Sequence, residues 1–176
     1  MKNRTLVIYK SKTGFTERYA QWICDELGGD KVAYKERKTI CFDNYDTVIF
    51  GSSFHAGMIS GVKWFKGKMK ELERKTTIVF ATGATPSNAP DIQKALRQNF
   101  SEEEWNKIKV YYMQSGLCYE KMGLGAKLMM AVFRKMLKKT EGESEAYKMV
   151  QHSYDHASKE FILPLVEYYN SKDRQS

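Results

Sequence analysis

Residues 6–23 constrain this chain most, because a short polar turn there joins a strand pattern to a helix pattern. The apolar run 6–9 predicts a buried strand. Residues 11–16 are rich in Ser, Thr and Gly, so they cannot continue that strand. Apolar residues then recur at helical spacing as far as Leu27, where the Gly28-Gly29 pair predicts the helix end.

A turn of this composition favours an anion. The first N–H groups of a helix have no partner within the helix and lie at the positive end of its dipole. Hydroxyls of Ser11, Thr13 and Thr16 stand beside them in the sequence, and a phosphate suits such a turn best. The alternative is a turn in which Thr13 or Thr16 caps the helix without any ligand.

Two common phosphate loops are excluded. Residues 61–69, GVKWFKGKM, have one residue too many between the glycines for a nucleoside triphosphate loop, and Met follows the Lys. Residues 123–128, GLGAKL, lack the third glycine of a dinucleotide fingerprint.

The stretch instead resembles the flavodoxin signature, whose aliphatic, aromatic, hydroxyl and small positions are filled by Val7, Ile8, Tyr9, Ser11, Gly14, Thr16, Ala20 and Ile23. The resemblance implies FMN as cofactor. Its phosphate would be held by Ser11, Lys12, Thr13, Gly14, Phe15 and Thr16. Phe15 departs from the usual polar residue, which removes one side-chain contact but leaves the backbone N–H.

Further strand patterns at 31–34, 47–50, 76–81 and 110–113 alternate with helical patterns. This alternation predicts an α/β fold with a parallel sheet covered on both faces. It fits a flavodoxin-like three-layer sandwich with a five-stranded sheet in the order 2-1-3-4-5. We expect one domain over 1–176, with an insertion at about 116–145 after the fifth strand.

In such a sheet the ligand lies beyond the carboxyl ends of the strands, where the strand order reverses. Three loops rich in Gly, Ser and Thr should meet there, at 11–16, 52–61 and 82–88. By resemblance, the second and third loops flank the flavin through Ser52, Ser53, Phe54, His55, Gly57, Thr82, Gly83, Ala84 and Thr85.

Two residues of the second loop have open roles. Phe54 either stacks on the flavin ring or packs into the core below the loop. His55 is the candidate catalytic residue, as a hydrogen-bond donor or proton source, because imidazole titrates near neutral pH. The alternative is a loop histidine that is simply solvated.

Composition narrows the class of protein. The net charge of +8 indicates an anionic partner, whereas typical flavodoxin shuttles are acidic. A nucleic-acid partner is not expected, since no binding motif accompanies the charge. Scattered cysteines and a first strand close to the N-terminus favour a cytoplasmic protein. Cys118 is either a redox thiol or an ordinary small apolar residue.

The candidate metal ligands are His152 and His156, which lie four residues apart on a helical region predicted at 146–169. No carboxylate completes a zinc pattern, so we expect no metal. 

The pattern at 122–139, MGLGAKLMMAVFRKMLKK, predicts a helix with cations and no acid. Its apolar residues form a stripe, as in a helix that docks on an anionic membrane surface or on a partner protein. The alternative is a stripe packed on the sheet with solvated lysines opposite.

The chain length, the block at 51–65 and the insertion resemble the flavodoxin-like menaquinone-dependent protoporphyrinogen dehydrogenases. This resemblance implies an FMN-dependent oxidoreductase that passes electrons from an organic donor to a quinone on the inner face of a membrane. The alternative is a non-catalytic electron-transfer module that docks to a redox partner. The sequence leaves the oligomeric state open.

Overall fold

A parallel sheet carries the fold of residues 4–174, the part of the chain that the computed structural model describes. Its strand order is β2-β1-β3-β5-β6, and each neighbouring pair is parallel. The strands are β1 (Thr5–Lys10), β2 (Asp30–Ala33), β3 (Thr47–His55), β5 (Thr76–Gly83) and β6 (Lys109–Gln114). Counted along the chain, this is the predicted order 2-1-3-4-5, which is therefore confirmed.

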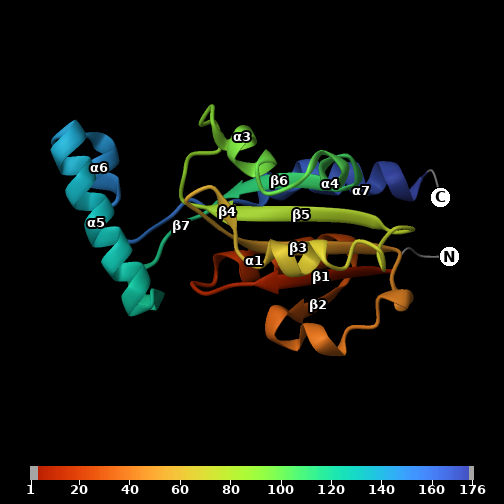
Figure 1. The fold of residues 1–176 in the computed structure, drawn as a ribbon. Helices are drawn as coiled ribbons and strands as arrows, with labels where there is room; N and C mark the ends of the chain where they lie inside the picture. Colours follow the sequence, from red (N-terminus) through yellow and green to blue (C-terminus); the bar gives the residue numbers. More distant parts are fainter. Residues whose placement is uncertain (1–3, 175–176) are drawn as a thin grey trace.

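Helices cover the sheet on both faces and complete three layers (Figure 1). Helices α1 (Phe15–Leu27) and α7 (Leu163–Asp173) pack on one face, and α2 (Val62–Lys66), α3 (Ile92–Arg97) and α4 (Glu102–Lys107) pack on the other. Neighbouring strand residues belong to opposite cores, as Ile49 and Phe50 show. Both faces are buried, which explains the continuous apolar runs of the central strands.

Local sequence signals account for the ends of several helices. Gly28 ends α1 with a φ of 69°, and its N–H donates to the Cys24 carbonyl at 2.8 Å. Ser101 caps α4, because its Oγ accepts from the Glu104 N–H at 3.2 Å. The Glu104 carboxylate returns the contact by accepting from the Ser101 N–H at 2.8 Å.

The predicted loop at 51–61 is wrong in its first half. Strand β3 continues to His55 and turns back through Ala56 and Gly57 into the antiparallel strand β4 (Met58–Ile59). Ala56 and Gly57 have φ values of 47° and 79°, which suit the tight turn of a hairpin. Gly, Ser and His at 51–55 concealed a strand because none of them has a strong strand preference.

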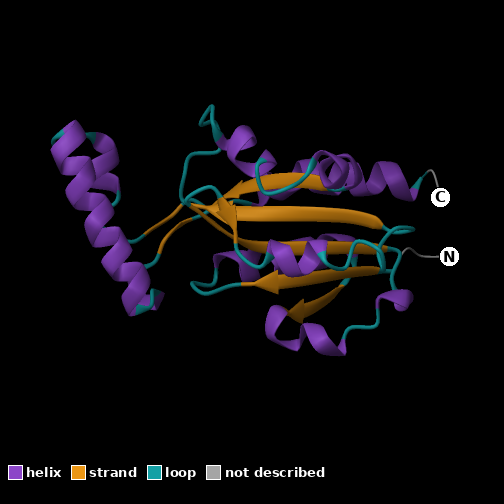
Figure 2. Ribbon diagram, in the orientation of Figure 1, coloured by secondary structure: helices purple, strands orange, loops and turns teal. Residues whose placement is uncertain are grey.

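After β6 the chain leaves the sheet and forms a projection, residues 115–157, which we call the α5 arm. It contains β7 (Gly116–Leu117), the 3₁₀ turn η3 (Tyr119–Lys121), α5 (Leu124–Glu141), α6 (Glu145–Met149) and β8 (Tyr154–Asp155). Strands β7 and β8 pair antiparallel and form the stem of the arm. Figure 2 shows them as the narrow strands that join the arm to the sheet.

The helical region predicted at 146–169 is wrong in its middle part. Its residues form α6, β8, the 3₁₀ turn η4 (Lys159–Ile162) and most of α7. Pro164 lies in the first turn of α7, where a missing N–H costs least, so it begins a helix instead of interrupting one. His152 and His156 therefore do not share a helix face, and His156 follows strand β8.

The remaining element boundaries differ modestly from the expectation. Helix α2 is short, since it ends at Lys66 and turns follow it. Two short 3₁₀ helices, η1 (Tyr34–Thr39) and η2 (Phe42–Asn44), fill the connection from β2 to β3. Within residues 4–174, no helix combines the length and apolar character that crossing a membrane requires.

Candidate functional site

A cavity of about 400 Å³ lies beyond the carboxyl ends of β1, β3 and β5 and is roofed by the start of α5. Its volume falls in the range of roughly 300–1,000 Å³ that small-molecule and cofactor sites usually have. It lies where the strand order reverses, as the topology predicts. The lining residues are Lys12, Thr13, Phe15, Thr16, Ser53, His55, Thr82, Gly83, Ala84, Ser115, Gly116, Leu117, Met122, Gly123, Gly125, Ala126, Met129 and Met130.

The turn between β1 and α1 has the backbone that an anion site needs. Gly14 occupies the N-cap of α1 with a φ of 96°, a left-handed conformation that a residue with a side chain adopts only under strain. Its own N–H donates to Ser11 Oγ at 3.1 Å, and Ser11 keeps its hydroxyl hydrogen for a ligand. As glycine has no side chain, the first N–H groups of α1 are not capped from that position.

A hydroxyl pair joins the first loop to the third. Thr16 and Thr82 are both buried and share a hydrogen bond of 2.7 Å between their Oγ1 atoms. Since both residues also line the cavity, this bond fixes the start of α1 against the end of β5.

Two lysines lie near the turn from different parts of the chain. Lys12 lines the cavity. A Cβ placed on Gly14 would lie 3.5 Å from Nζ of Lys121, which belongs to the α5 arm. An anion at this turn would therefore meet a cation from the turn and one from the arm, and charge-assisted contacts are the stronger kind.

His55 ends β3 and lines the cavity. Partial desolvation lowers its pKa below the usual value, and the charge of Lys12 lowers it further. The imidazole is accordingly neutral at neutral pH, so one ring nitrogen can donate a hydrogen bond and the other can accept one.

Strand geometry separates the second loop's predicted residues into two groups. Ser53 and His55 line the cavity, whereas Ser52 and Phe54 lie on the opposite face of β3, because successive strand residues alternate. The Phe54 ring packs edge-on against Tyr112, with 6.0 Å between centroids, at the core below. Of the two roles considered for Phe54, the structure shows the core role. Within the described chain, the fully buried Ser52 Oγ has no hydrogen-bond partner.

Two other predicted residues also lie outside the lining. The Gly57 carbonyl accepts from Asn99 Nδ2 at 2.8 Å and is thus directed toward α3. The Thr85 carbonyl accepts from the Tyr112 hydroxyl at 2.8 Å, at the outer end of the third loop. Thr82, Gly83 and Ala84 do line the cavity, so only the first part of the third loop contributes.

The sequence did not predict that the arm forms one wall of the cavity. Met122, Gly123, Gly125, Ala126, Met129 and Met130 form its apolar part, and Ser115, Gly116 and Leu117 come from the stem. The glycines at 123 and 125 gave no usable signal, since a Cβ at either position would meet no heavy atom within 4 Å. Cys118, also considered for the site, does not line the cavity, and its Sγ donates to Glu120 at 3.4 Å.

Contacts at the base of the arm hold this wall against the sheet. Arg18 Nη2 of α1 lies 2.7 Å from Asp155 Oδ1 of β8, and the Arg18 guanidinium lies 5.3 Å from the ring centroid of Phe15. The hydrogen bond from Arg18 lowers the pKa of the Asp155 carboxyl. The Tyr154 hydroxyl also donates to the Ala84 carbonyl at 3.3 Å. The arm thus contacts Ala84 directly and Phe15 through Arg18, and both of these residues line the cavity.

The donor set suits a phosphorylated, partly apolar and planar molecule. Hydroxyls, helix N–H groups and lysine lie at one end, and methionines lie along the roof. None of the described lining residues is acidic, so nothing there opposes an anion. The chemistry of these residues therefore fits FMN, the cofactor implied by the sequence resemblance.

Comparison with known proteins gives one match to a family. The model of the flavodoxin domain matches residues 6–144. This range includes all three loops and the whole of α5. No curated protein matches the chain.

Solved structures give more distant similarities. A flavoprotein in complex with FMN from Lactobacillus acidophilus is 19% identical, with a TM-score of 0.47 over 64% of this chain and 92% of that chain. A WrbA-like flavodoxin from Agrobacterium tumefaciens is 17% identical, with a TM-score of 0.45 over 70% and 87%. A Trp repressor binding protein from Bacillus subtilis is 14% identical, with a TM-score of 0.46 over 63% and 82%.

Proposed function

Because the chain belongs to the flavodoxin domain family, we propose that it binds FMN in the cavity under α5 and acts as an oxidoreductase. In this reaction an organic donor is oxidised, and its electrons and protons end on a quinone, which is reduced to the quinol. FMN supplies the electron chemistry, while the protein binds the cofactor, orients it and excludes water.

The observation that carries this proposal is the apolar roof supplied by the arm. A shuttle needs its cofactor edge open to a partner protein, whereas here Leu117, Met122, Met129 and Met130 close over the polar loops. Methionine side chains adapt their shape to flat apolar molecules. A roof of this kind suits an apolar organic substrate next to the cofactor.

The chain's own residues have distinct tasks in this proposal. Thr13, Thr16 and the first N–H groups of α1 hold the phosphate, and Lys12 and Lys121 neutralise it. His55 is the candidate catalytic residue. Since it is neutral at neutral pH, it can take up a proton that leaves the donor and release it again.

Protoporphyrinogen and menaquinone are the donor and acceptor implied by the resemblance of the 51–65 block and the insertion. The alternative is a non-catalytic electron-transfer module that docks to a redox protein. The net charge of +8 favours the enzyme over a shuttle of the usual acidic type.

The test begins with the cofactor. The purified protein is denatured, and released FMN is measured by its absorbance. A protein that carries no flavin and takes up none from added FMN would contradict the whole proposal.

The second step separates the two functions. The FMN-loaded protein is reduced anaerobically by light and mixed with a menaquinone analogue or with an oxidised redox protein. We expect fast reoxidation by the quinone, and His55→Gln should slow turnover with protoporphyrinogen without loss of FMN. Reoxidation by the redox protein but by no quinone would support the electron-transfer module instead.

A further inference from the structure

The outer face of α5 leaves a row of large apolar side chains uncovered. Leu124, Leu128, Val132 and Met136 follow one another at four-residue steps and are 87%, 68%, 63% and 53% exposed. Residues at this spacing lie on one side of a helix. Elsewhere in the described chain the exposed large apolar residues, such as Met58 and Leu163, are scattered. Exposed and contiguous apolar surface of this kind marks an interaction site.

The opposite side of α5 already has partners. Leu137 is buried, the Arg134 guanidinium lies 5.3 Å from the Tyr119 ring centroid, and Lys138 Nζ lies 5.7 Å from that of Tyr147. The helix is therefore held by η3 and α6 from within the arm. The sheet-packing alternative for this stripe is wrong, since none of the described α5 residues belongs to either core cluster.

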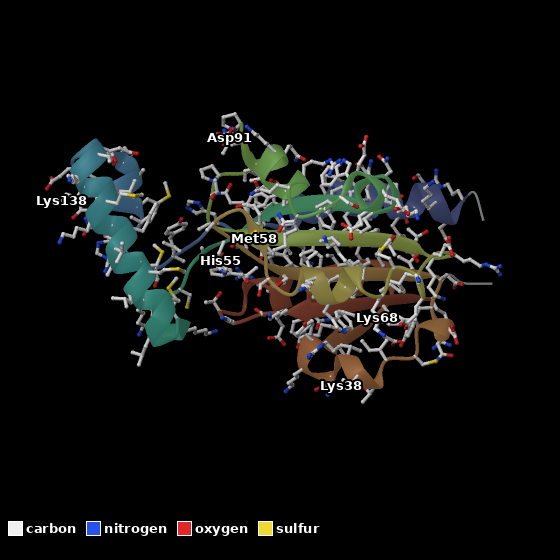
Figure 3. The ribbon with its side chains drawn as sticks, viewed as in Figure 1. Lys38, His55, Met58, Lys68, Asp91 and Lys138 are labelled. Atoms are coloured by element: carbon white, nitrogen blue, oxygen red, sulfur yellow. The ribbon has the colours of Figure 1, made fainter. Side chains whose placement is uncertain are left out.

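Cations accompany the apolar row. Lys127, Lys135 and Lys139 fall on the neighbouring row of the helix, in which positions repeat every four residues and Ala131 fills the gap, and all three lysines are exposed. Lys138, which contacts Tyr147, also lies at the outer edge of the arm (Figure 3) but does not belong to this row. No acid occurs in α5 before Glu141 at its last position. An apolar row beside a one-signed cationic row is typical of a helix that lies in a membrane interface.

We infer that this face of α5 docks on the surface of a bilayer that contains anionic lipids. The apolar row would enter the boundary between headgroups and acyl chains, while the lysines meet lipid phosphates. Met129 belongs both to the cavity lining and to the exposed surface, at 63%. Docking would therefore bring the cavity next to the bilayer. This inference goes beyond the proposed oxidoreductase function and does not depend on it.

The lysines of α5 favour an anionic bilayer over a second copy of the chain as the partner of this face. In a two-fold symmetric dimer the same surface patch meets itself. Lys127, Lys135 and Lys139 of both copies would then come close together and repel one another. An anionic lipid surface instead complements every one of these charges.

The experiment is co-sedimentation of the FMN-treated full chain with two kinds of vesicle, at low and at high salt. One kind is phosphatidylcholine alone, and the other is phosphatidylcholine mixed with phosphatidylglycerol. We expect binding to the anionic vesicles at low salt, weaker binding at high salt, and little binding to the neutral vesicles.

Two variants with the same charge change locate the surface. Lys135→Glu with Lys139→Glu removes cations of α5, whereas Lys38→Glu with Lys70→Glu removes exposed cations of the sheet body. Each nearby cation adds about 1 kcal/mol, so the α5 variant should bind anionic vesicles roughly 30-fold more weakly or worse, and the control should change little. Leu128→Asn with Val132→Asn should also weaken binding.

Several results would overturn the inference. They are equal binding to both vesicles, binding to neither, or an equal loss in the α5 variant and its control. A dimer in sedimentation equilibrium that Leu128→Asn with Val132→Asn dissociates would assign the face to a second copy. Far-UV circular dichroism checks that α5 persists, and if the asparagine variant loses helix, the charge variants alone decide. Flavin content, measured on the same samples, reports on the proposed function separately.

Discussion

Helices α1 and α5 have similar apolar periodicity in the sequence but opposite surroundings in the structure. Tyr19, Ala20 and Ile23 of α1 are fully buried against the sheet. Leu128 and Val132 of α5 are mostly exposed, and the helix stands at the end of a stem beyond the strands (Figure 1). Periodicity thus establishes that a helix has an apolar face, but it does not establish what covers that face.

The charges of the two helices differ as well. Helix α1 carries three acids, Glu17, Asp25 and Glu26, and its one base, Arg18, is half-buried and pairs with Asp155 of the arm. Helix α5 instead presents lysine and arginine up to its last turn and carries no acid before Glu141. A helix whose charges are cationic in this way suits a surface that carries the opposite charge.

The largest predicted effect tests this comparison directly. Ile23→Ala removes a fully buried side chain of α1 and should lower the free energy of unfolding by about 2–5 kcal/mol. Val132→Ala on α5 should change it by less than about 0.5 kcal/mol, because that side chain is exposed. Urea unfolding measures both. If both variants lost the same free energy of unfolding, the outer face of α5 would be covered by other residues of this same chain.

The next effect concerns the turn before α1. Gly14→Val forces a branched side chain into a left-handed conformation at a cost of about 1–3 kcal/mol, which would weaken FMN binding roughly tenfold to a hundredfold. Isothermal titration with FMN measures the affinity. Gly142→Val is the control, since its φ of 65° imposes a comparable strain, and Gly142 does not line the cavity. FMN binding that survives Gly14→Val intact would contradict the site.

A smaller effect follows from the threonine pair that joins α1 to β5. Thr16→Val leaves the buried Thr82 hydroxyl without its partner and should cost about 1–2 kcal/mol in the free energy of unfolding. Thr85→Val, at an exposed position of the same third loop, is the matched control and should cost less. Chemical denaturation of both variants without FMN gives the difference, which would vanish if the hydroxyl contact contributed nothing.

The tie between the arm and α1 predicts a pH dependence. The hydrogen bond from Arg18 lowers the pKa of Asp155 in the folded protein. A depressed carboxyl pKa stabilises the fold fully above the unfolded value, about 4, and this stabilisation is lost as the pH falls through the folded value. The protection factors of the β7 and β8 amides, which correct for the pH dependence of intrinsic exchange, should therefore fall in acid.

Asp155→Asn should remove this pH dependence and raise exchange in the stem already at neutral pH. Glu103→Gln, which breaks an exposed ion pair with Lys107 on α4, is the control and should leave the stem unchanged. If acid opened the stem equally in wild type and Asp155→Asn, another group would be responsible.

The smallest effect tests whether the arm contributes to cofactor binding. Lys121→Gln removes the cation near Gly14 and should weaken FMN binding by no more than about fivefold, since exposed charge pairs contribute roughly 0–1 kcal/mol. Riboflavin lacks the phosphate, so its affinity should not change. An equal loss for both ligands would show that Lys121 acts on the ring or on the fold.

Local patterns in the sequence were sufficient to predict most of the strands of the sheet. Strands β1, β5 and β6, and the start of β3, were predicted within a few residues because apolar runs between turn residues are strong signals. The turn at 11–16 was located for the same reason. The loop at 51–61 was misread, since β3 continues through it, and the alternation along that strand then decided that Ser53 and His55 line the cavity while Ser52 and Phe54 do not.

By itself, the sequence determined the α/β class and the hydroxyl-rich turn, because each depends on residues that are neighbours in the chain. The strand order was expected from the flavodoxin-like resemblance, since its pairings, such as Thr5 with Thr47, join distant residues. Only the tertiary structure decided that the arm roofs the cavity and that the outer face of α5 stays open. Those outcomes depend on contacts between distant residues, such as the bond from Arg18 to Asp155 and the pairing of β7 with β8. No local pattern encodes such contacts, since the partner of an apolar face or a charge is chosen by the folded arrangement of the whole chain.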